Sequence, residues 1–456
     1  MAFPDGFAWG VAAASYQIEG GAYDDGKGLS VWDVFCKRPG AIWEGHTGDV
    51  ACDHYHRYKD DVALMARLGV RNYRLSVNWP RVLPDGTGAV NPKGIAFYDR
   101  LVDALLSAGI TPWITLFHWD YPLELFCRGG WRSPDSPEWF AEYAGVLSDA
   151  LGDRVSHWIT HNEPQCFIGL GHQTSLHAPG LALAFSEVLR ATHNALLAHG
   201  RAVQALRARA RGQCSVGMAT CGTIMMPATE SAADLEAGRR AMFDVTARNM
   251  FQSAWWLDPI YFGRYPEDGL RLYGGDAPKV RDGDMDVISQ PTDFLGCNIY
   301  HGRYVRAGAD GKPEALPQAP GYPMTTQSNW PVTPECLYWG PRLHFERYGA
   351  PIVITENGHQ NADTVMLDGR VHDPQRIDYV RRHLLQLERA VADGVDVRGY
   401  FQWTFMDNFE WALGYGVRVG LVHTDFVTQT RTPKDSAYWY KKAVETNGAA
   451  LHETPG

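Results

Sequence analysis

The sequence has no CxxC pair, no long uninterrupted apolar run and no excess of positive charge. Its eight cysteines are scattered over 456 residues, so neither a zinc ribbon nor a disulfide framework is expected, and most thiols should be reduced and buried. No stretch approaches the ~18 consecutive apolar residues of a membrane span. The 52 acidic residues outnumber the 42 basic ones and give a formal net charge of −10. We therefore expect neither a membrane nor a nucleic-acid partner.

Several further signals are missing. The first ten residues lack the basic segment and apolar run of an export signal, so a cytoplasmic protein is expected. No glycine-rich phosphate loop joins a strand to a helix, so no nucleotide or flavin cofactor is expected. Cys52, His54 and His56 resemble metal ligands, but they stand at the start of a predicted helix, where side chains two residues apart diverge. We therefore expect no metal site, and nothing in the sequence indicates an oligomeric state.

What the sequence does contain is typical of a folded chain with a large core. Hydrophobic residues make up 45% and charged residues 21%, which excludes a disordered protein. The 16 Trp and 21 Tyr suit the faces of sugars as well as the protein core, so their number alone favours sugar binding only slightly.

Apolar strand patterns alternate with helical patterns along almost the whole chain. Helical spacing occurs at 55–68, 94–108, 183–210, 375–393 and 435–446. This alternation predicts a parallel sheet, and eight such units predict an α/β fold, a single-domain (β/α)₈ TIM barrel with long active-site loops. We place the barrel domain at 1–450 and a C-terminal tail at 451–456. The predicted strands are 7–12, 72–76, 113–117, 157–160, 215–219, 294–299, 352–355 and 399–403.

Acidic residues follow two of these predicted strands. Glu163 comes after the fourth strand and Glu356 after the seventh, which in a barrel places both at the mouth where the loops converge. Each acid has a simpler interpretation, as a helix cap, a loop residue or a solvated strand end. Because 193 residues separate the two, they meet only if the barrel brings both strand ends to one pocket. The residue pattern allows such a pair without requiring it.

Seven motifs together resemble the family 1 glycoside hydrolases, the β-glucosidase family, from Phe7 to about Val444. A lone Asn-Glu-Pro would be weak evidence, but here all the motifs occur in the family's order. They are FAWGVAAASYQIEGG at 7–21, YRLSVNWPR at 73–81, HWD at 118–120, NEP at 162–164, NIY at 298–300, ITENG at 354–358 and NFEW at 408–411.

The resemblance implies a retaining mechanism by double displacement. Glu356 would be the nucleophile and Glu163 the acid/base, with their carboxyl groups about 5–5.5 Å apart. Two charges about 5 Å apart repel by roughly 3 kcal/mol at an effective dielectric of about 20, so one acid should keep its proton. Arg74, which the family pattern places near the nucleophile, would keep Glu356 ionised. Its alternative role is a structural salt bridge inside the barrel.

The resemblance also implies a set of sugar-binding residues. Amide, imidazole and carboxyl groups suit sugar hydroxyls, and a Trp face suits the axial hydrogens. Taken singly, His118 or Trp403 would be read as an ordinary core residue, and Trp330 is expected to hold the aglycone. The implied residues are Gln17, His118, Trp119, Asn162, Asn298, Tyr300, Trp330, Trp403, Glu410 and Trp411.

The expected substrates are small β-glycosides or short oligosaccharides with a terminal non-reducing β-D-glucosyl residue. Relatives that cleave 6-phosphorylated sugars replace the acid at Glu410 and supply a nearby Lys, whereas 412–418 has none here. An unphosphorylated sugar is therefore favoured. Gln165 and Val419 replace aromatic residues frequent in the family, so galactosyl and fucosyl substrates stay open.

Two other functions share this pattern. A transglycosylase would pass the sugar to an alcohol instead of water after the same first step. A catalytically silent sugar-binding barrel would need the aromatic residues but not both acids, so the presence of Glu163 and Glu356 argues against it.

Overall fold

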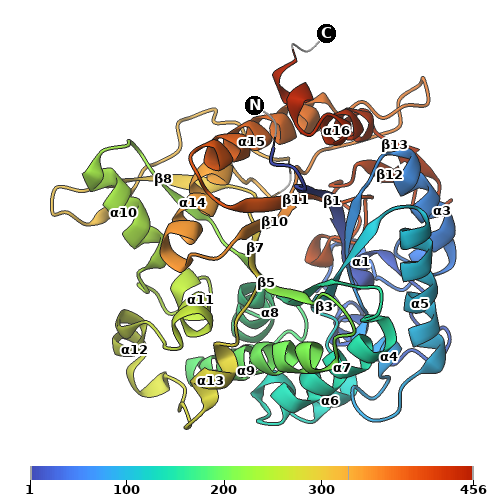
Figure 1. Cartoon of the computed structure of the whole chain (residues 1–456), viewed down its shortest axis with the longest axis horizontal. Coiled ribbons are helices and arrows are strands. Elements are labelled where there is room, and N and C mark those ends of the chain that lie inside the picture. The colour runs from blue at the N-terminus through green and yellow to red at the C-terminus, as the bar shows by residue number, and fades with distance from the viewer. Residues whose placement is uncertain (1–2, 327, 454–456) are drawn as a thin grey trace.

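The computed structural model describes residues 3–326 and 328–453, which fold around a closed barrel of parallel strands (Figure 1). Each barrel strand lies where the sequence predicts one, with ends that shift by at most two residues, so the predicted (β/α)₈ barrel is confirmed. The barrel strands are β1 (Ala8–Ala13), β2 (Asn72–Ser76), β3 (Thr111–Phe117), β4 (His157–Asn162), β5 (Ser215–Cys221), β7 (Phe294–Asn298), β10 (Ile352–Asn357) and β11 (Val397–Trp403).

The barrel closes because β1 pairs with both β2 and β11. Ala12 of β1 lies opposite Arg74 on one side and opposite Trp403 on the other. Since all the strands run parallel, their carboxyl ends meet at one mouth. The fourth and seventh strands of the barrel are β4 and β10, and only β5 and β7 stand between them. The carboxyl ends of β4 and β10 both lie at this mouth.

Nearly every barrel-strand side chain is buried, because one face of each strand meets the helices and the other fills the barrel. This is why the strands read as continuous apolar runs in the sequence. Inside, the ring of Trp113 lies 5.6 Å from that of Phe294 and 5.1 Å from that of Phe401, so three different strands contribute to one aromatic layer.

Helices surround the barrel and follow its strands (Figure 1). The five predicted helices are confirmed, with ends shifted by at most two residues. Helical spacing in the fourth predicts one buried face of six residues. Tyr379, Val380, His383, Leu384 and Leu387 are buried, whereas Val391 is half-buried. The main outer helices are α3 (His54–Arg67), α5 (Pro92–Ser107), α7 (Ser136–Leu151), α9 (Phe185–Arg209), α11 (Ser253–Phe262), α14 (Cys336–Tyr348), α15 (Pro374–Ala392) and α16 (Asp435–Glu445).

Shorter elements fill the loops between strands and outer helices. Among them are the short helices α1 (Ser15–Ile18), α2 (Val31–Phe35), α4 (Trp79–Val82), α6 (Leu123–Cys127), α8 (Pro164–Ile168), α12 (Glu267–Tyr273) and α13 (Asp284–Ile288). A longer helix, α10 (Ala232–Phe243), follows β6. Single helical turns lie at Trp43–Gly45, Gly130–Arg132, Gly169–Gln173, Gly274–Asp276, Trp411–Leu413 and Ala449–His452.

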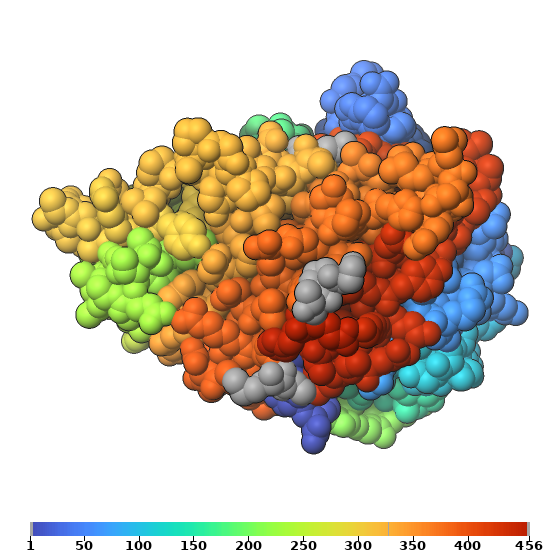
Figure 2. Space-filling model, turned by 90° about the horizontal axis from the view of Figure 1, so that it is seen from above, coloured from blue at the N-terminus to red at the C-terminus, as the bar shows by residue number. Residues whose placement is uncertain are grey.

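Two small sheets outside the barrel were not predicted from the sequence. One consists of β6 (Ile224–Pro227), β8 (Gly302–Ala307) and β9 (Pro313–Ala315), and its outer end protrudes beside α10 in Figure 2, gold beside yellow-green. The other is the antiparallel pair β12 (Val422–Thr424) and β13 (Arg431–Pro433). Their strands have only three to six residues, too few for a clear alternation of apolar and polar side chains.

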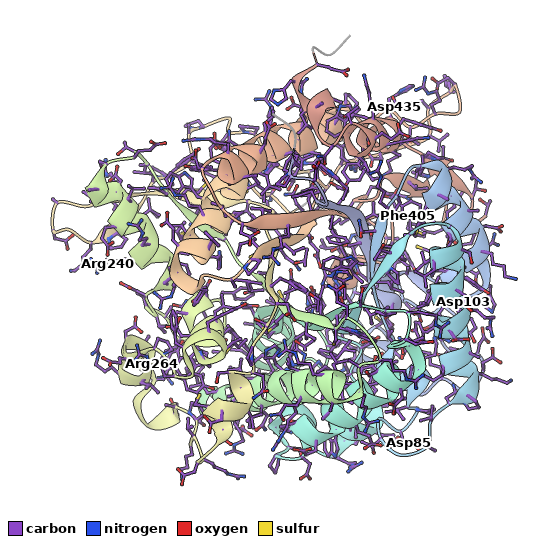
Figure 3. All side chains as sticks on the ribbon, in the orientation of Figure 1. Asp85, Asp103, Arg240, Arg264, Phe405 and Asp435 are labelled. Carbon is purple, nitrogen blue, oxygen red and sulfur yellow. The ribbon has the colours of Figure 1, made fainter. Side chains whose placement is uncertain are left out.

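The interior and the surface separate as expected for a folded chain (Figure 3). Phe405 is buried, whereas Asp85, Asp103 and Arg264 are exposed at the periphery. In the predicted tail, Leu451 is fully buried, and residues 454–456 lie outside the described residues.

None of the helices described by the structure is both long and apolar enough to pass through a membrane. The cytoplasmic location stays a prediction. The predicted burial of most thiols is confirmed for Cys36, Cys52, Cys166, Cys297 and Cys336, whereas Cys127 is exposed and Cys214 and Cys221 are half-buried.

The residues that resemble metal ligands near the start of α3 have separate partners. His54 Nδ1 lies 2.8 Å from Asp61, and His56 Nδ1 lies 2.6 Å from Asp53. The thiol of Cys52 donates to the carbonyl oxygen of Asp407 at 3.2 Å.

Candidate active site

Glu163 and Glu356 lie at the carboxyl ends of β4 and β10. β4 ends at Asn162, and Glu163 adopts a left-handed backbone conformation with φ 48° before Pro164 begins α8. Proline suits this first helical position because its missing N–H would have no partner there. β10 continues through Glu356 to Asn357, two residues beyond its predicted end. Strand geometry rather than a loop therefore positions Glu356.

The carboxylate of Glu356 accepts two strong hydrogen bonds. Arg74 Nη1 donates to Oε1 at 2.7 Å, and the hydroxyl of Tyr300 donates to Oε2 at 2.7 Å. Arg74 comes from β2 and is 1% exposed, so water barely screens its charge. Its Nη1 also donates to the carbonyl oxygen of Thr355 at 2.9 Å. A guanidinium and a hydroxyl that bond both oxygens stabilise the ionised form of Glu356.

Glu163 has a different set of neighbours. Asn298 Nδ2 donates to its Oε1 at 2.7 Å, and the thiols of Cys166 and Cys221 lie close by. No cation directly contacts the Glu163 carboxyl among the described residues. The site therefore stabilises a charged Glu163 less than it stabilises a charged Glu356.

Asn162 joins the surroundings of the two carboxyl groups. Its Oδ1 accepts hydrogen bonds from Nη2 of Arg74 and from Nδ2 of Asn298, the latter at 3.0 Å. Arg74 then contacts Glu356, and Asn298 contacts Glu163. One amide therefore connects the two acids, which the sequence separates by 193 residues.

Burial raises the pKa of both carboxyl groups, since desolvation penalises the charged form. For Glu356 the charge of Arg74 opposes this effect, whereas the nearby charge of Glu163 adds to it. Two interacting acids of this kind titrate as a pair. Arg74 bonds Glu356 directly and so favours the ionised form of that carboxyl, while Glu163 has no such contact with a cation among the described residues. The site can therefore supply a nucleophilic carboxylate and a proton donor together.

His118 directly follows β3 and lies beside Asn162 at the mouth of the barrel. Asn162 Nδ2 donates to His118 Nε2 at 3.0 Å, so the ring proton belongs on Nδ1. Burial, and then the charge of Arg74, lowers the pKa of His118 and keeps the ring neutral. Its ring stacks 5.7 Å from that of Trp403 and 6.0 Å from that of Trp411.

Gln17 of α1 and Glu410 on the segment after β11 lie together. Gln17 Nε2 donates to Asn408 Oδ1 at 3.1 Å, to the carbonyl oxygen of Phe409 at 2.9 Å and to Glu410 Oε2 at 3.3 Å. Its Oε1 is buried and has no partner among the described residues. Desolvation and the charge of Glu356 raise the pKa of Glu410 to about 8. Both side chains are able to bond a ligand hydroxyl.

Trp330 lies farther out, on the segment after β9. Its ring centroid is 5.1 Å from that of Tyr300 and 5.2 Å from that of His301, and its side chain is half-buried. Tyr300 therefore lies between Trp330 and Glu356.

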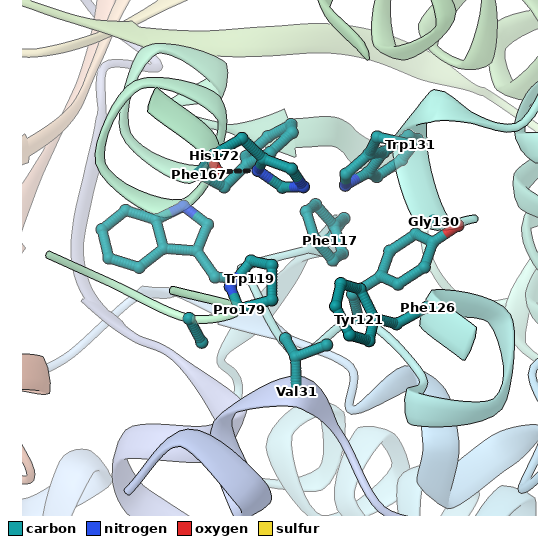
Figure 4. A pocket seen from close by; sticks show the side chains of 11 residues that line it. Val31, Phe117, Trp119, Tyr121, Phe126, Gly130, Trp131, Phe167, His172 and Pro179 are labelled. Atoms are coloured by element: carbon teal, nitrogen blue, oxygen red, sulfur yellow. Dashed lines mark hydrogen bonds between the residues drawn. The ribbon is translucent and has the colours of Figure 1, made fainter. Parts of the chain in front are cut away.

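A small apolar pocket lies behind Trp119, at the back of the mouth (Figure 4). Trp119 also donates from Nε1 to the carbonyl oxygen of Asn162 at 2.9 Å. Neither Glu163 nor Glu356 lines this pocket. Its lining comprises Val31, Phe117, Trp119, Tyr121, Phe126, Gly130, Trp131, Phe167, His172, Ala178 and Pro179.

The structure also adds residues that sequence reasoning did not single out. Thr355 Oγ1 donates to Asn298 Oδ1 at 2.6 Å, and Arg74 Nε donates to Thr115 Oγ1 at 3.2 Å. Asn408, Cys166 and Cys221 also contact predicted site residues. Asn408 is the first residue of the NFEW motif, and Cys166 lies two residues after the NEP motif, so the sequence offered a signal for both. No motif lies near Cys221.

The fold and this site define a class of protein: a (β/α)₈ barrel with two carboxyl groups at the carboxyl ends of its strands. The family model of glycosyl hydrolase family 1 matches residues 1–449. The chain therefore belongs to glycosyl hydrolase family 1.

Relatives and solved structures of high similarity agree with this assignment. "Thermostable beta-glucosidase B" of Thermobispora bispora is 46% identical over 455 residues, which cover 98% of this chain and 92% of that protein. A solved structure of the beta-glucosidase from Thermotoga maritima with glucoimidazole is 44% identical, with a TM-score of 0.90, and covers 98% of this chain and 99% of that one. The same enzyme with galacto-hydroximolactam is 43% identical, with a TM-score of 0.89 and the same coverage.

Proposed function

We propose that this protein is a retaining β-glucosidase in which Glu356 attacks the anomeric carbon while Glu163 protonates the leaving oxygen. A glucosyl ester on Glu356 results. Glu163, now ionised, then takes a proton from water, and the water oxygen displaces Glu356 from the sugar. The observation that carries this proposal is the contrast between the charged Arg74 at Glu356 and the neutral neighbours of Glu163.

The proposed sugar-binding groups surround this pair. Gln17 Oε1, which lacks a protein partner among the described residues, and the Nδ1–H of His118 would each bond a sugar hydroxyl. Trp403 would lie against the apolar face of the ring. Glu410 would accept from two neighbouring hydroxyls, as a carboxyl with two oxygens can. Asn162 and Trp411 contact His118, while Asn298 bonds Glu163 and Tyr300 bonds Glu356. These four residues and Trp119 would also contact the sugar, and Trp330 would contact the aglycone.

We propose terminal, unphosphorylated β-D-glucosyl residues of small β-glycosides or short oligosaccharides as the substrates. Glu410 lies among other acids and offers no positive charge to pair with a phosphate on the sugar. Galactosyl substrates are proposed as a second class, supported by the relative that binds galacto-hydroximolactam. Hydrolysis and transglycosylation share the glucosyl–Glu356 intermediate, so product analysis with and without an added alcohol acceptor separates them.

Azide offers a direct test of the two carboxyl roles, because it is a small anion that needs no base. In Glu356→Gly, azide should enter from the face that the lost carboxylate occupied and give an α-glucosyl azide. In Glu163→Gly, Glu356 still forms the intermediate, so azide should attack the other face and give a β-glucosyl azide. A dinitrophenyl glucoside is the substrate for both, since its leaving group needs no proton.

The expected losses without azide are also different. Glu356→Gly should lose at least about 10⁴-fold in kcat/KM, and Glu163→Gly about 10²- to 10⁴-fold on a poor leaving group. Glu346→Gly, at an exposed position of α14, is the matched control and should keep wild-type activity. Azide products of the same anomeric form from both site variants would disprove the assignment.

A further inference from the structure

Three groups that bind metals meet at the end of β4. A carboxylate oxygen of Glu163 and the sulfurs of Cys166 and Cys221 all lie within 4.8 Å of one another. In the described residues, no other set of three His, Cys, Asp or Glu side chains comes together in this way. The proposed mechanism uses Glu163 but neither thiol.

Two features of the fold bring the three groups together, namely the start of α8 and the pairing of β4 with β5. Glu163 precedes α8 and Cys166 lies in its first turn, three residues later, which places both side chains on one side. Cys221 is the last residue of β5, and the amide of Glu163 donates to the carbonyl oxygen of Ala219 on that strand at 2.9 Å. The cluster therefore joins two adjacent strand ends.

The spacing of the two sulfurs suits a tetrahedral metal. They are 3.7 Å apart, well beyond the ~2.05 Å of a disulfide bond. Two thiolates bound at about 2.3 Å to a tetrahedral zinc stand about 3.8 Å apart. The free protein thus already holds both sulfurs at the separation that such a centre needs.

The surrounding groups would support a bound ion. Asn298 holds one oxygen of Glu163 at 2.7 Å and so fixes the orientation of the carboxyl. Gln165 is fixed by a hydrogen bond from its Nε2 to Thr220 Oγ1 at 2.6 Å. Its Oε1 faces Cys221 Sγ at 3.8 Å, so the site has a polar wall.

We infer that Glu163, Cys166 and Cys221 form an inhibitory site for a thiophilic divalent cation such as Zn²⁺. The ion takes two thiolates and the carboxylate as ligands and water as the fourth. Burial raises the pKa of Cys221 to about 11, so its thiol is neutral before binding and loses its proton to the solvent as zinc enters. Zinc binding depends only on the positions of these three side chains. Inhibition rests in addition on the proposed role of Glu163, because a carboxylate bound to zinc cannot protonate the leaving oxygen.

Direct binding is the first measurement. Metal-free protein, kept reduced by a phosphine, is dialysed against ZnCl₂, and one zinc per chain is expected. CoCl₂ in place of zinc should give the thiolate-to-cobalt charge-transfer absorption. Cys221→Ser should weaken binding at least about tenfold and remove that absorption, since a direct ligand is lost. Unchanged binding or absorption in Cys221→Ser would overturn the site.

Cys214→Ser is the matched control, because Cys214 stands just before the opposite end of β5, about 20 Å away at ~3.3 Å per residue. It should bind zinc as the wild type does. Thermal unfolding of both variants shows whether each is folded before its binding is compared.

The second measurement is the rate. Zinc should abolish wild-type activity, excess EDTA should restore it, and Cys221→Ser should keep its own metal-free rate at the same zinc concentration. Recovery with added reductant but not with EDTA would indicate disulfide formation and overturn the inference. Zinc bound at the cluster with an unchanged rate would overturn the inhibition, while the azide products report separately on the role of Glu163.

Discussion

At the scale of single residues, we propose that the partners of each carboxyl decide its role. Glu163 and Glu356 are the same residue type, and both are buried. A guanidinium and a phenol contact Glu356, whereas an amide and two thiols surround Glu163. A shift of one pKa unit corresponds to about 1.4 kcal/mol, so one charge-assisted hydrogen bond is enough to separate the two acids.

This asymmetry predicts how the pH profile responds to Tyr300→Phe. A plot of kcat/KM against pH should be bell-shaped, because activity needs Glu356 ionised and Glu163 protonated. Tyr300 donates to the charged form of Glu356 at 2.7 Å, so losing the hydroxyl raises the pKa of Glu356. A hydrogen bond to a charged group contributes about 1.5–3 kcal/mol, so the acid limb should move up by about one to two pH units. The alkaline limb should stay in place.

The control for this measurement is Tyr440→Phe, whose hydroxyl donates to the carbonyl oxygen of Gly10 at 2.7 Å, away from both acids. Its profile should match that of the wild type. If Tyr300→Phe moved only the alkaline limb, Glu356 would not be the group that must be ionised.

At the scale of elements, a buried ion cluster ties the loops of the mouth to the outer helices. Arg376 of α15 contacts Asp363 at 2.6 Å and also contacts Asp373. Lys434, just before α16, contacts Asp363 at 2.5 Å and Asp407 at 2.7 Å. All of these side chains are fully buried. The loops after β10 and β11, and so Glu410 and Trp411, depend on this cluster for their position.

Lys434→Met tests this dependence at nearly constant volume. It leaves Asp363 and Asp407 with one cation fewer in a buried site, and breaking a buried pair costs about 3–5 kcal/mol. Lys93→Met removes an exposed contact with Asp25 and should cost at most about 1 kcal/mol. Urea unfolding compares the two variants, and equal stabilities would contradict a structural role for the cluster.

At the scale of the whole molecule, closure of the barrel makes distant parts of the chain mutually dependent. β1 is hydrogen-bonded to β11, and the amide of Phe3 donates to the carbonyl oxygen of Asn447 at 3.1 Å. We propose one catalytic domain over residues 1–450. Leu451 is fully buried just beyond that boundary, so the boundary can be tested directly.

Ending the chain after residue 450 removes Leu451 and the carbonyl oxygen that accepts from Arg381 Nε at 2.7 Å. The free energy of unfolding should fall by about 2–5 kcal/mol, as when a buried Leu is replaced by Ala. Leu367→Ala, at a fully exposed position, should change it by at most about 0.5 kcal/mol. A truncated chain as stable as the full one would show that 451–456 is a dispensable tail.

The parts of the fold that could be predicted have a strong local signal. The strand observed at Ile352–Asn357 was predicted at 352–355, because burial on both faces requires a continuous apolar run. The three-residue strand Pro313–Ala315 was missed because it is too short to show a period. For the site, the residue pattern alone predicted only that Glu163 and Glu356 are acids at strand ends. Their expected roles came from the resemblance to the family.

The sequence by itself determined the number and order of the barrel strands, since apolar periodicity is a local property that each segment carries alone. The tertiary structure decided which side chains share one space. Arg74, Asn162 and Glu356 come from three strands, and Cys166 and Cys221 are 55 residues apart. Contacts of this kind depend on strand register and barrel closure, which arise from interactions across the whole chain. Charge placement at Glu356 and the sulfur pair beside Glu163 therefore became visible only in the folded molecule.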